Sequence, residues 1–299
     1  MLNKINKYKI SFLILHYHTI EDTQESVESI IKNCGEIKFE NFEIIIVDNG
    51  SKNKSGERLE KEYLDNKKIK VIINSENLGF SKGNNIGFKY IKEYCNSDFI
   101  VMMNNDIVII QNDFIPSIIE EYEKSKFAVL GPKILLPDGK KNIHREKLPP
   151  IYVYRIENIK LYIKWFINFL DKYQILRNIK NKYVGEKQVK ESNKKEIRKE
   201  NVIVHGSCMI FSKEYIEKFD GLDEKTFLYG EEDLLYIKLI KNNLKSIYNP
   251  KLFVLHNEDS STDAITNNDK RKKIMFVAKY QIIARKVIIK DLKKMKRKM

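Results

Sequence analysis

The sequence has few cysteines and no long apolar run. Its three cysteines, Cys34, Cys95 and Cys208, lie far apart without the spacing of metal ligands, which favours reduced thiols. No apolar stretch is long enough for a transmembrane helix, and the apolar run at residues 12–15 is too short for a signal peptide. We therefore expect a cytoplasmic protein, at most peripheral to the inner face of the cell membrane.

Two common phosphate-binding motifs are also missing. A dinucleotide-binding dehydrogenase needs G-x-G-x-x-G after its first strand, whereas residues 15–18 here contain no glycine. The Walker sequence G-x-x-x-x-G-K-[ST] does not occur either. If the chain binds a nucleotide, it uses neither of these two glycine-rich loops.

Positive charge is concentrated at one end of the chain. The net charge is +14, and residues 270–299 carry thirteen Lys or Arg and one Asp, which leaves only +2 for the remainder. Apolar residues from Ile274 to Met295 fall on one arc of a predicted helix, with lysines opposite. This pattern favours docking on an anionic membrane surface over nucleic-acid binding. The alternative is a final helix that packs on the body with its lysines in water.

Apolar segments alternate with helical segments through the first part of the chain. Strands are expected at residues 10–15, 43–47, 70–73 and 98–103. Strand and helix alternate at the spacing of βαβ units, which predicts an α/β fold with a parallel sheet. Each strand ends in polar residues, and these ends can line one crevice at the edge of the sheet.

The fourth of these strands ends in Asn104, Asn105 and Asp106. Ligands of open α/β sheets bind just beyond the carboxyl ends of the strands. A carboxylate beside two amides suits a hard cation that bridges a phosphorylated ligand. The same residue types also favour ordinary turns, which is the alternative interpretation.

Two stretches in the second half have a distinct composition. Five apolar residues recur at helical spacing and predict a helix that packs on the core, with membrane contact as the alternative: Ile156, Ile159, Ile163, Phe166 and Leu170. Residues 177–200 are rich in lysine and poor in apolar side chains, which predicts a basic insertion or lid.

Acidic residues and one histidine follow. Glu231, Glu232 and Asp233 open a helix expected to reach residue 242, and the helix dipole alone favours acids there. His256 ends a short strand expected at residues 252–255. Taken singly, each of these residues has an ordinary structural explanation.

Taken together, five stretches resemble a family 2 glycosyltransferase of the GT-A fold, nearest in pattern to bacterial rhamnosyltransferase-like members. The resemblance covers residues 9–136 and 200–262. The stretches are Tyr17 with Val47-Asp48-Asn49-Gly50-Ser51; Asn77-x-Gly79-Phe80-x-x-Gly83-x-Asn85; Asn104-Asn105-Asp106; residues 206–211 with Gly221-Leu222-Asp223; and Gly230-Glu231-Glu232-Asp233 with His256.

The resemblance implies a Rossmann-like α/β fold with a mainly parallel sheet, helices on both faces, a helical insertion and an amphipathic C-terminal helix. It divides the chain into a glycosyltransferase domain at residues 1–265 and the basic helix at 266–299. Within the domain, the expected parts are a nucleotide-binding half at 1–136, the insertion at 149–200 and an acceptor half at 201–265.

The same resemblance implies roles for individual residues. The donor nucleotide would contact Tyr17, Asp48, Asn77, Gly79, Lys82, Asn85, Asn104 and Asn105. Asp106 and His256 would bind a divalent metal, Mn²⁺ or Mg²⁺. The acceptor side would comprise Gly206, Ser207 and Glu231, with Glu232 as the catalytic base or, after a shift of one residue, Asp233.

The implied reaction is inverting transfer of a sugar from a UDP- or dTDP-sugar to a hydroxyl of a bacterial surface glycan or lipid-linked acceptor. A homodimer is a further expectation. Asn104 stands where the family has the first acid of D-x-D, so metal binding could be weaker. The alternative is therefore a non-catalytic GT-A-like module that its basic tail recruits to a membrane complex.

Overall fold

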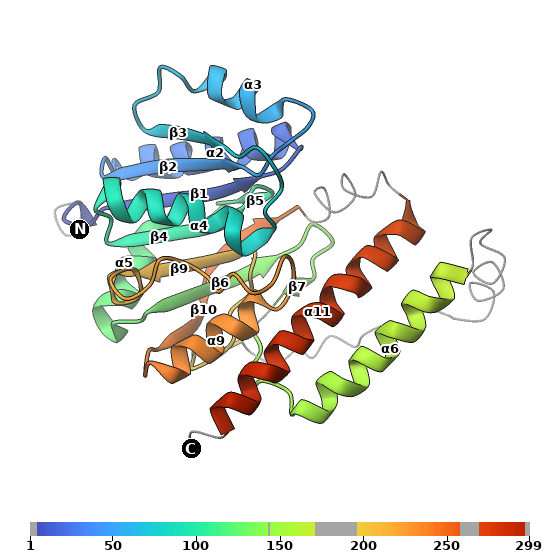
Figure 1. The fold of residues 1–299 in the computed structure, drawn as a ribbon. Coiled ribbons are helices and arrows are strands. Elements are labelled where there is room, and N and C mark those ends of the chain that lie inside the picture. Colours follow the sequence, from blue (N-terminus) through green and yellow to red (C-terminus); the bar gives the residue numbers. More distant parts are fainter. Residues whose placement is uncertain (1–4, 143, 171–195, 258–268, 297–299) are drawn as a thin grey trace.

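A computed structural model describes residues 5–142, 144–170, 196–257 and 269–296 (Figure 1). Residues 177–195 of the expected basic insertion and residues 266–268 and 297–299 of the expected tail lie outside this part. The helices are α2 (Ile20–Glu36), α3 (Ser55–Glu62), α4 (Phe80–Tyr90), the π-helix η1 (Ile91–Cys95), α5 (Phe114–Ser125), α6 (Ile151–Leu170), α8 (Lys213–Ile216), α9 (Glu231–Lys241) and α11 (Lys270–Lys296).

The strands form one sheet in the order β3-β2-β1-β4-β9-β6-β10-β5, with β7 beside β6 and β8 beside β10. Their bounds are β1 (Ile10–His16), β2 (Phe42–Asp48), β3 (Ile69–Ile73), β4 (Phe99–Asn104), β5 (Ile107–Val108), β6 (Val129–Leu135), β7 (Lys141–Asn142), β8 (Lys199–Glu200), β9 (Cys208–Ser212) and β10 (Ser246–His256). The first four in this order are parallel, as predicted. Beyond β4 the sheet is mixed, because β9 runs antiparallel to both β4 and β6 while β10 is parallel to β6.

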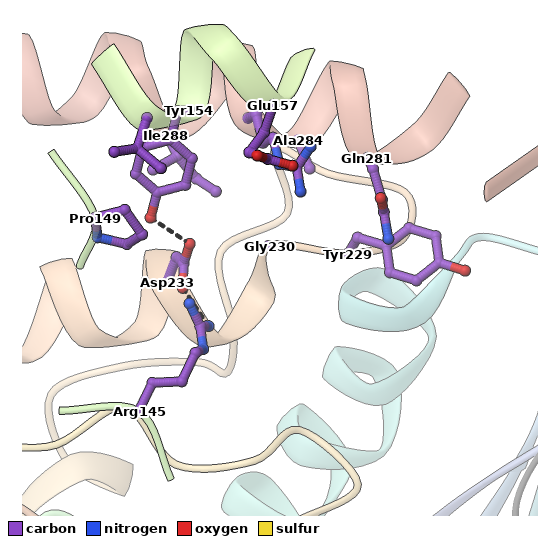
Figure 2. Close-up of a pocket in the computed structure, with 12 residues that line it drawn as sticks. Arg145, Pro149, Tyr154, Glu157, Tyr229, Gly230, Asp233, Gln281, Ala284 and Ile288 are labelled. Carbon is purple, nitrogen blue, oxygen red and sulfur yellow. Dashed lines mark hydrogen bonds and ion pairs between the residues drawn. The ribbon is translucent and has the colours of Figure 1, made fainter. Parts of the chain in front are cut away.

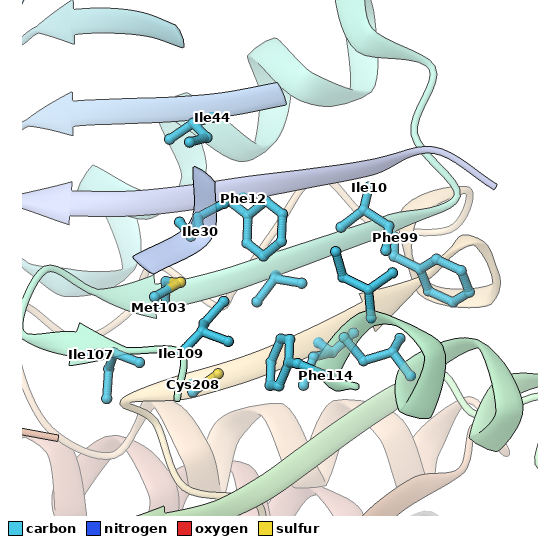
Figure 3. Close-up of a cluster of buried hydrophobic side chains, with 14 of the residues drawn as sticks. Ile10, Phe12, Ile30, Ile44, Phe99, Met103, Ile107, Ile109, Phe114 and Cys208 are labelled. Atoms are coloured by element: carbon cyan, nitrogen blue, oxygen red, sulfur yellow. The ribbon is translucent and has the colours of Figure 1, made fainter. Parts of the chain in front are cut away.

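Alternate residues of the central strands face opposite sides of the sheet, as the two-residue period of a strand requires. On β1 and β4, Phe12 and Met103 belong to the core cluster that α2 and α5 cover (Figure 3). Leu13 and Met102 belong to a second cluster, which α4, α8 and α9 cover. Both faces of the sheet are therefore buried under helices, which explains why these strands are almost entirely apolar.

Helices α6 and α11 pack against each other as a pair outside the main body, with α11 nearer the sheet (Figure 1). The apolar arc of α11 faces inward, because Ile288 and Leu292 join Leu234 and Ile237 of α9 and Tyr154 of α6 in a third cluster. The structure thus shows the alternative interpretation of the final helix, which packs on the body. Membrane contact by residues 270–299 stays a prediction.

The apolar stripe of α6 does not pack on the core. Ile156, Ile159, Ile163, Phe166 and Leu170 are all exposed, with Ile159 at 59% and Leu170 at 60%. The preferred prediction for this stripe is therefore wrong: the helix forms where expected, but it buries Tyr154 and Asn158 instead. Within the described ranges, every helix is either too short or too polar to cross a bilayer.

Candidate functional site

Asp106 and His256, the two expected metal ligands, lie side by side. The short strand β5 follows Asp106 and pairs antiparallel with the end of β10, so that His256 stands opposite Ile107. The Asn257 backbone N–H also donates to the Asp106 carbonyl at 3.0 Å. This pairing brings His256 Nε2 to 3.1 Å from Asp106 Oδ1.

Both side chains are buried, with exposed fractions of 7% for Asp106 and 8% for His256. Within the described residues, neither Asp106 Oδ1 nor His256 Nδ1 has a hydrogen-bond partner, so the close approach of the two side chains is not a well-formed hydrogen bond. A carboxylate oxygen with unused lone pairs beside an imidazole nitrogen fits a divalent cation. No third His, Cys, Asp or Glu among the described residues joins them.

The loop at residues 205–207 lies next to this pair. The Asn104 N–H donates to the Ser207 carbonyl at 2.9 Å, which ties the loop to the end of β4. His205 Nδ1 lies 2.9 Å from Ser207 Oγ, and the His205 and His256 ring centroids are 6.4 Å apart. The predicted acceptor loop and the predicted metal ligands therefore share one region, at the carboxyl end of the parallel strands.

The three acids at the start of α9 reach the same loop. The Gly206 N–H donates to Glu232 Oε1 at 2.6 Å. A Cβ atom added at Gly206 would lie 3.2 Å from Glu232 Oε1 and 3.5 Å from Glu231 Oε1, so both carboxylates face this glycine. Three segments that are distant in sequence thus meet here: the end of β4, the loop before β9 and the first turn of α9.

The three carboxylates have different surroundings. Arg145 Nη2 lies 3.0 Å from Glu232 Oε2 and also pairs with Asp233 Oδ1. The Tyr154 hydroxyl donates to Asp233 Oδ2 at 2.6 Å (Figure 2). Both oxygens of Glu232 and of Asp233 are therefore engaged by protein groups, and Asp233 points toward α6 rather than toward the acceptor loop.

Glu231 differs from its two neighbours. In the described structure its Oε2 atom is buried and has no hydrogen-bond partner. Burial of the carboxyl group, reinforced by the nearby charge of Glu232, raises its pKa from 4.5 to about 7. A carboxyl group with such a pKa exchanges its proton near neutral pH, which suits a general base.

A cavity of about 200 Å³ adjoins Asp233, between α6, α9 and α11. Arg145 and Asp233 form one wall, and Tyr154, Tyr229 and Gln281 contribute to the others (Figure 2). The cavity lies on the Arg145 side of the acids, whereas Gly206 and the Asp106–His256 pair are not among its lining residues.

The expected nucleotide-binding residues at the ends of β1 and β2 also lie close together. Asp48 is buried, and it accepts hydrogen bonds from the Ser51 N–H at 3.2 and 3.3 Å. Burial raises the pKa of its carboxyl group, while the Ser51 hydrogen bonds act in the opposite direction. The half-buried Tyr17 ring lies 4.3 Å from the His18 ring, and the His18 N–H donates to Ser51 Oγ at 2.9 Å.

Asn77 and Gly79 shape the loop before α4. Asn77 Oδ1 accepts hydrogen bonds from the Gly79 N–H at 2.9 Å and from Asn49 Nδ2 at 3.0 Å. Gly79 has φ +82°, and a Cβ atom there would lie only 2.2 Å from the Phe227 carbonyl oxygen. This glycine therefore allows close contact between the donor-side loop and the segment that leads into α9.

Asn85 and Asn105 have their amide groups engaged by protein partners. Asn85 exchanges two hydrogen bonds with the Leu222 backbone, at 2.7 and 3.0 Å, and so joins α4 to the segment after β9. Asn105 Nδ2 donates to the Thr19 hydroxyl at 2.7 Å, which holds the start of α2. Asn104 is half-buried and Lys82 is exposed, so these two side chains are more accessible.

Sequence reasoning missed Arg145, Tyr154 and Asn49. Arg145 is held in place because its backbone pairs with Ile203 in an isolated bridge, and this carries its side chain to the acids of α9. No local pattern around Arg145 or Tyr154 indicates such contacts. Asn49 lies within the resembling stretch at residues 47–51, so its position beside Asn77 was the easiest of the three to find.

Comparisons with known proteins identify the family of the chain. The sequence model of glycosyl transferase family 2 matches residues 11–219, more than two thirds of the chain. The low-salt glycan biosynthesis hexosyltransferase Agl10 of Haloferax volcanii is 23% identical over 223 residues, which are 75% of this chain and 59% of that protein. The glycosyltransferase GlyG of Streptococcus pneumoniae is 26% identical over 122 residues, 41% of this chain and 38% of that protein.

Solved structures share the fold at low sequence identity. The mannosyltransferase PcManGT of Pyrobaculum calidifontis, solved with GDP-Man and Mn²⁺, has a TM-score of 0.52 at 12% identity, over 96% of this chain and 74% of that one. S. aureus TarS 1–349 has a TM-score of 0.51 at 14% identity, over 91% of this chain and 65% of that one. The sheet and the helices that cover it match the fold of these structures. The chain therefore has the GT-A fold, and the family match shows that it belongs to glycosyl transferase family 2.

Proposed function

We propose that the protein is an inverting glycosyltransferase that moves a sugar from a nucleoside-diphosphate sugar to an acceptor hydroxyl. The observation that carries this proposal is the meeting of Asp106, His256 and the carboxylates of α9 at the loop of residues 205–207. Such a reaction must stabilise a departing diphosphate and accept a proton from the acceptor, and these groups suit both needs.

On the donor side, Tyr17 and Asp48 would bind the base, which the sequence pattern predicts to be uracil or thymine. Asp106 and His256 would hold a divalent cation, Mn²⁺ or Mg²⁺, which when bound supplies positive charge beside the leaving diphosphate. PcManGT, a protein of similar fold, was solved with Mn²⁺, which supports this choice. Asn104 is half-buried beside Asp106, where its amide can contact the donor.

On the acceptor side, we propose that Glu231 accepts the hydroxyl proton. The sequence pattern favours Glu232, but both Glu232 oxygens are engaged by the Gly206 N–H and by Arg145. Glu231 retains a buried oxygen that none of the described residues engages, and its pKa is about 7. Glu232 and Asp233 would then hold Arg145 and fix the first turn of α9 against the acceptor loop.

The acceptor that we propose is a surface glycan or a lipid-linked sugar of a bacterial cell. The named role of Agl10 in glycan biosynthesis supports a glycan acceptor. The cavity beside Arg145 and Asp233 would hold a more distant part of the acceptor, because Asp233 is the only one of the three acids of α9 that lines it.

A panel of nucleotide sugars tests this proposal. Wild-type protein is incubated with each donor, Mn²⁺ and candidate glycan acceptors, and release of nucleoside diphosphate is measured. We expect release with at least one uridine or thymidine donor, and loss of release when EDTA removes the metal. Release that is equally fast with EDTA would contradict the assignment of Asp106 and His256.

The second candidate is a non-catalytic module of the same fold, which Asn104 favours because it replaces the first acid of the metal-binding motif. Isothermal titration calorimetry separates the two proposals. Donor binding in the presence of Mn²⁺ supports the enzyme, whereas the absence of binding by every nucleotide sugar in the panel supports the module.

A further inference from the structure

The outer face of α6 carries the largest group of exposed apolar side chains in the described structure. More than half of the large apolar residues that are exposed there belong to this one helix, including aromatic residues such as Tyr152, Tyr162 and Phe166. Monomeric proteins rarely leave such a patch in water, and patches of this kind mark interaction sites. We use "outer face" for the stripe of Ile156, Ile159, Ile163, Phe166 and Leu170.

This face is held in a fixed orientation by α11. The guanidinium group of Arg271 donates to the backbone carbonyls of Asn168 and Phe169 and so caps the end of α6. Tyr154 and Ile288 join the two helices to α9 in one apolar cluster. The outer face is therefore presented by a packed pair of helices anchored to the body.

Positive charge surrounds the apolar stripe. The two helices, residues 151–170 and 270–296, contain fourteen Lys or Arg and only two acids, Glu157 and Asp291. Lys160 and Lys164 are exposed on α6 itself, and Lys286 of α11 lies 5.4 Å from the centroid of the Tyr162 ring. A second copy of this chain would bring an equally basic helix pair, so like charges oppose self-association through this face.

A groove between the two helices combines the same features. It measures about 400 Å³ and lies between Leu161 of α6 and Ile274 and Val277 of α11, with Lys164, Lys270 and Lys273 at its edge. Apolar walls with ammonium groups at the rim suit the glycerol and phosphate region of an anionic phospholipid.

We propose that the outer face of α6 docks on an anionic phospholipid bilayer, with its apolar side chains among the upper acyl chains and the surrounding lysines on lipid phosphates. An amphipathic helix with a basic border lies in the plane of the membrane surface in this way. α6 carries Arg155, Lys160 and Lys164 and does not qualify as a membrane-spanning helix, which agrees with a flat orientation.

Docking through this face would also orient the catalytic site relative to the membrane. The cavity beside Arg145 and Asp233 lies between α9 and this helix pair, so docking would bring the carboxylates of α9 close to a lipid-linked acceptor. This consequence rests on the proposed function, whereas docking itself does not, because vesicle binding is measured without donor or acceptor.

Vesicle flotation tests the proposal with the full chain. The vesicles contain either phosphatidylcholine alone or equal parts of phosphatidylcholine and phosphatidylglycerol. We expect wild-type protein to float with the anionic vesicles and far less with the neutral ones. The double variant Ile163→Glu/Phe166→Glu should bind at least about tenfold more weakly, since both side chains are more than half exposed and their replacement leaves the fold intact.

A matched control makes the same change in charge elsewhere. Leu64 and Tyr94 are exposed at 75% and 66% and lie outside α6 and α11, so Leu64→Glu/Tyr94→Glu should float like the wild type. Trp165, the only tryptophan, lies half-buried on α6 and reports on this helix directly. Its emission should shift to shorter wavelength on binding, and lipids brominated in the upper acyl chains should quench it.

Four outcomes would overturn the proposal. The first is no binding to anionic vesicles, and the second is equal binding by the two double variants. The third is binding without any change in Trp165 emission, which would assign the interaction to the lysines of α11 alone. A dimer in sedimentation velocity that Ile163→Glu/Phe166→Glu abolishes, without vesicle binding, would assign the face to a second copy of the chain and would likewise overturn it.

Discussion

Replacing Glu231 with glutamine should raise stability and lower activity together. Burial of the carboxyl group raises the pKa of Glu231 from 4.5 to about 7, so the folded state carries an energetic cost whenever this group is ionised. A tenfold change in an acid dissociation constant is worth about 1.4 kcal/mol, so a rise in pKa from 4.5 to about 7 corresponds to a cost of roughly 3 kcal/mol. Glu231→Gln removes the charge and with it this cost.

The gain in the free energy of unfolding of Glu231→Gln must depend on pH. Below pH 4.5 the carboxyl group is protonated in both the folded and the unfolded state, and the cost is absent. It develops as the pH rises from 4.5 to about 7 and is complete above that. The free energy of unfolding of Glu231→Gln should therefore exceed that of the wild type by up to about 3 kcal/mol at pH 8 and by only about 1 kcal/mol at pH 5.

The activity should change in the opposite direction. Loss of a general base lowers turnover by ~10²–10⁴-fold, so Glu231→Gln should release nucleoside diphosphate at least about a hundred times more slowly than the wild type. Wild-type activity should rise with pH up to about 7 and then level off, because the base must be ionised.

The change in stability is measured by urea unfolding at pH 5 and pH 8, followed by circular dichroism. The change in turnover is measured by release of nucleoside diphosphate. Glu60→Gln, at an exposed position on α3, is the neutral control. Glu232→Gln is the contrasting variant, because it takes a partner from Arg145 and should lower stability. A Glu231→Gln protein that is no more stable at pH 8 and turns over within about tenfold of the wild type would refute the role given to Glu231.

Two further substitutions test the surroundings of the site. Arg145→Ala leaves the buried Asp233 with only one of its two partners, and it should lower the free energy of unfolding by about 1–3 kcal/mol. An unchanged midpoint of urea unfolding would contradict the importance of the Arg145–Asp233 pair. Gly79→Ala places a methyl group 2.2 Å from the Phe227 carbonyl oxygen at a positive φ, and it should lower the free energy of unfolding by about 2 kcal/mol or more. Gly35→Ala, in α2 with open space around it, should be neutral or slightly stabilising. Equal melting temperatures of the two variants would contradict this.

The positions of Asp106 and Asp48 could be predicted because both follow strands of the parallel half. Apolar runs that end in polar residues mark the carboxyl ends of such strands, and these ends meet at one edge of the sheet. The antiparallel insertion of β9 between β4 and β6 could not be predicted in this way. It depends on pairing between segments about a hundred residues apart, for which the local sequence carries no signal.

The stripe of α6 shows a second limit of sequence patterns. Periodicity correctly predicts a helix with an apolar side, but it does not say what covers that side. The usual assumption that an apolar stripe faces the core fails here because α6 packs on α11 through other residues, including Tyr154. The carboxylates of α9 show the same limit. Arg145 pairs with Glu232 and Asp233 and not with Glu231, and the sequence alone does not reveal this difference.

Donor binding with and without Mn²⁺ tests the central claim most directly. If Asp106 and His256 hold the cation beside the donor diphosphate, calorimetry should show wild-type donor affinity rising at least about tenfold when Mn²⁺ is added. The same titration of Asp106→Asn should show little or no gain. Donor affinity that is the same with and without Mn²⁺, and the same in both proteins, would contradict the account.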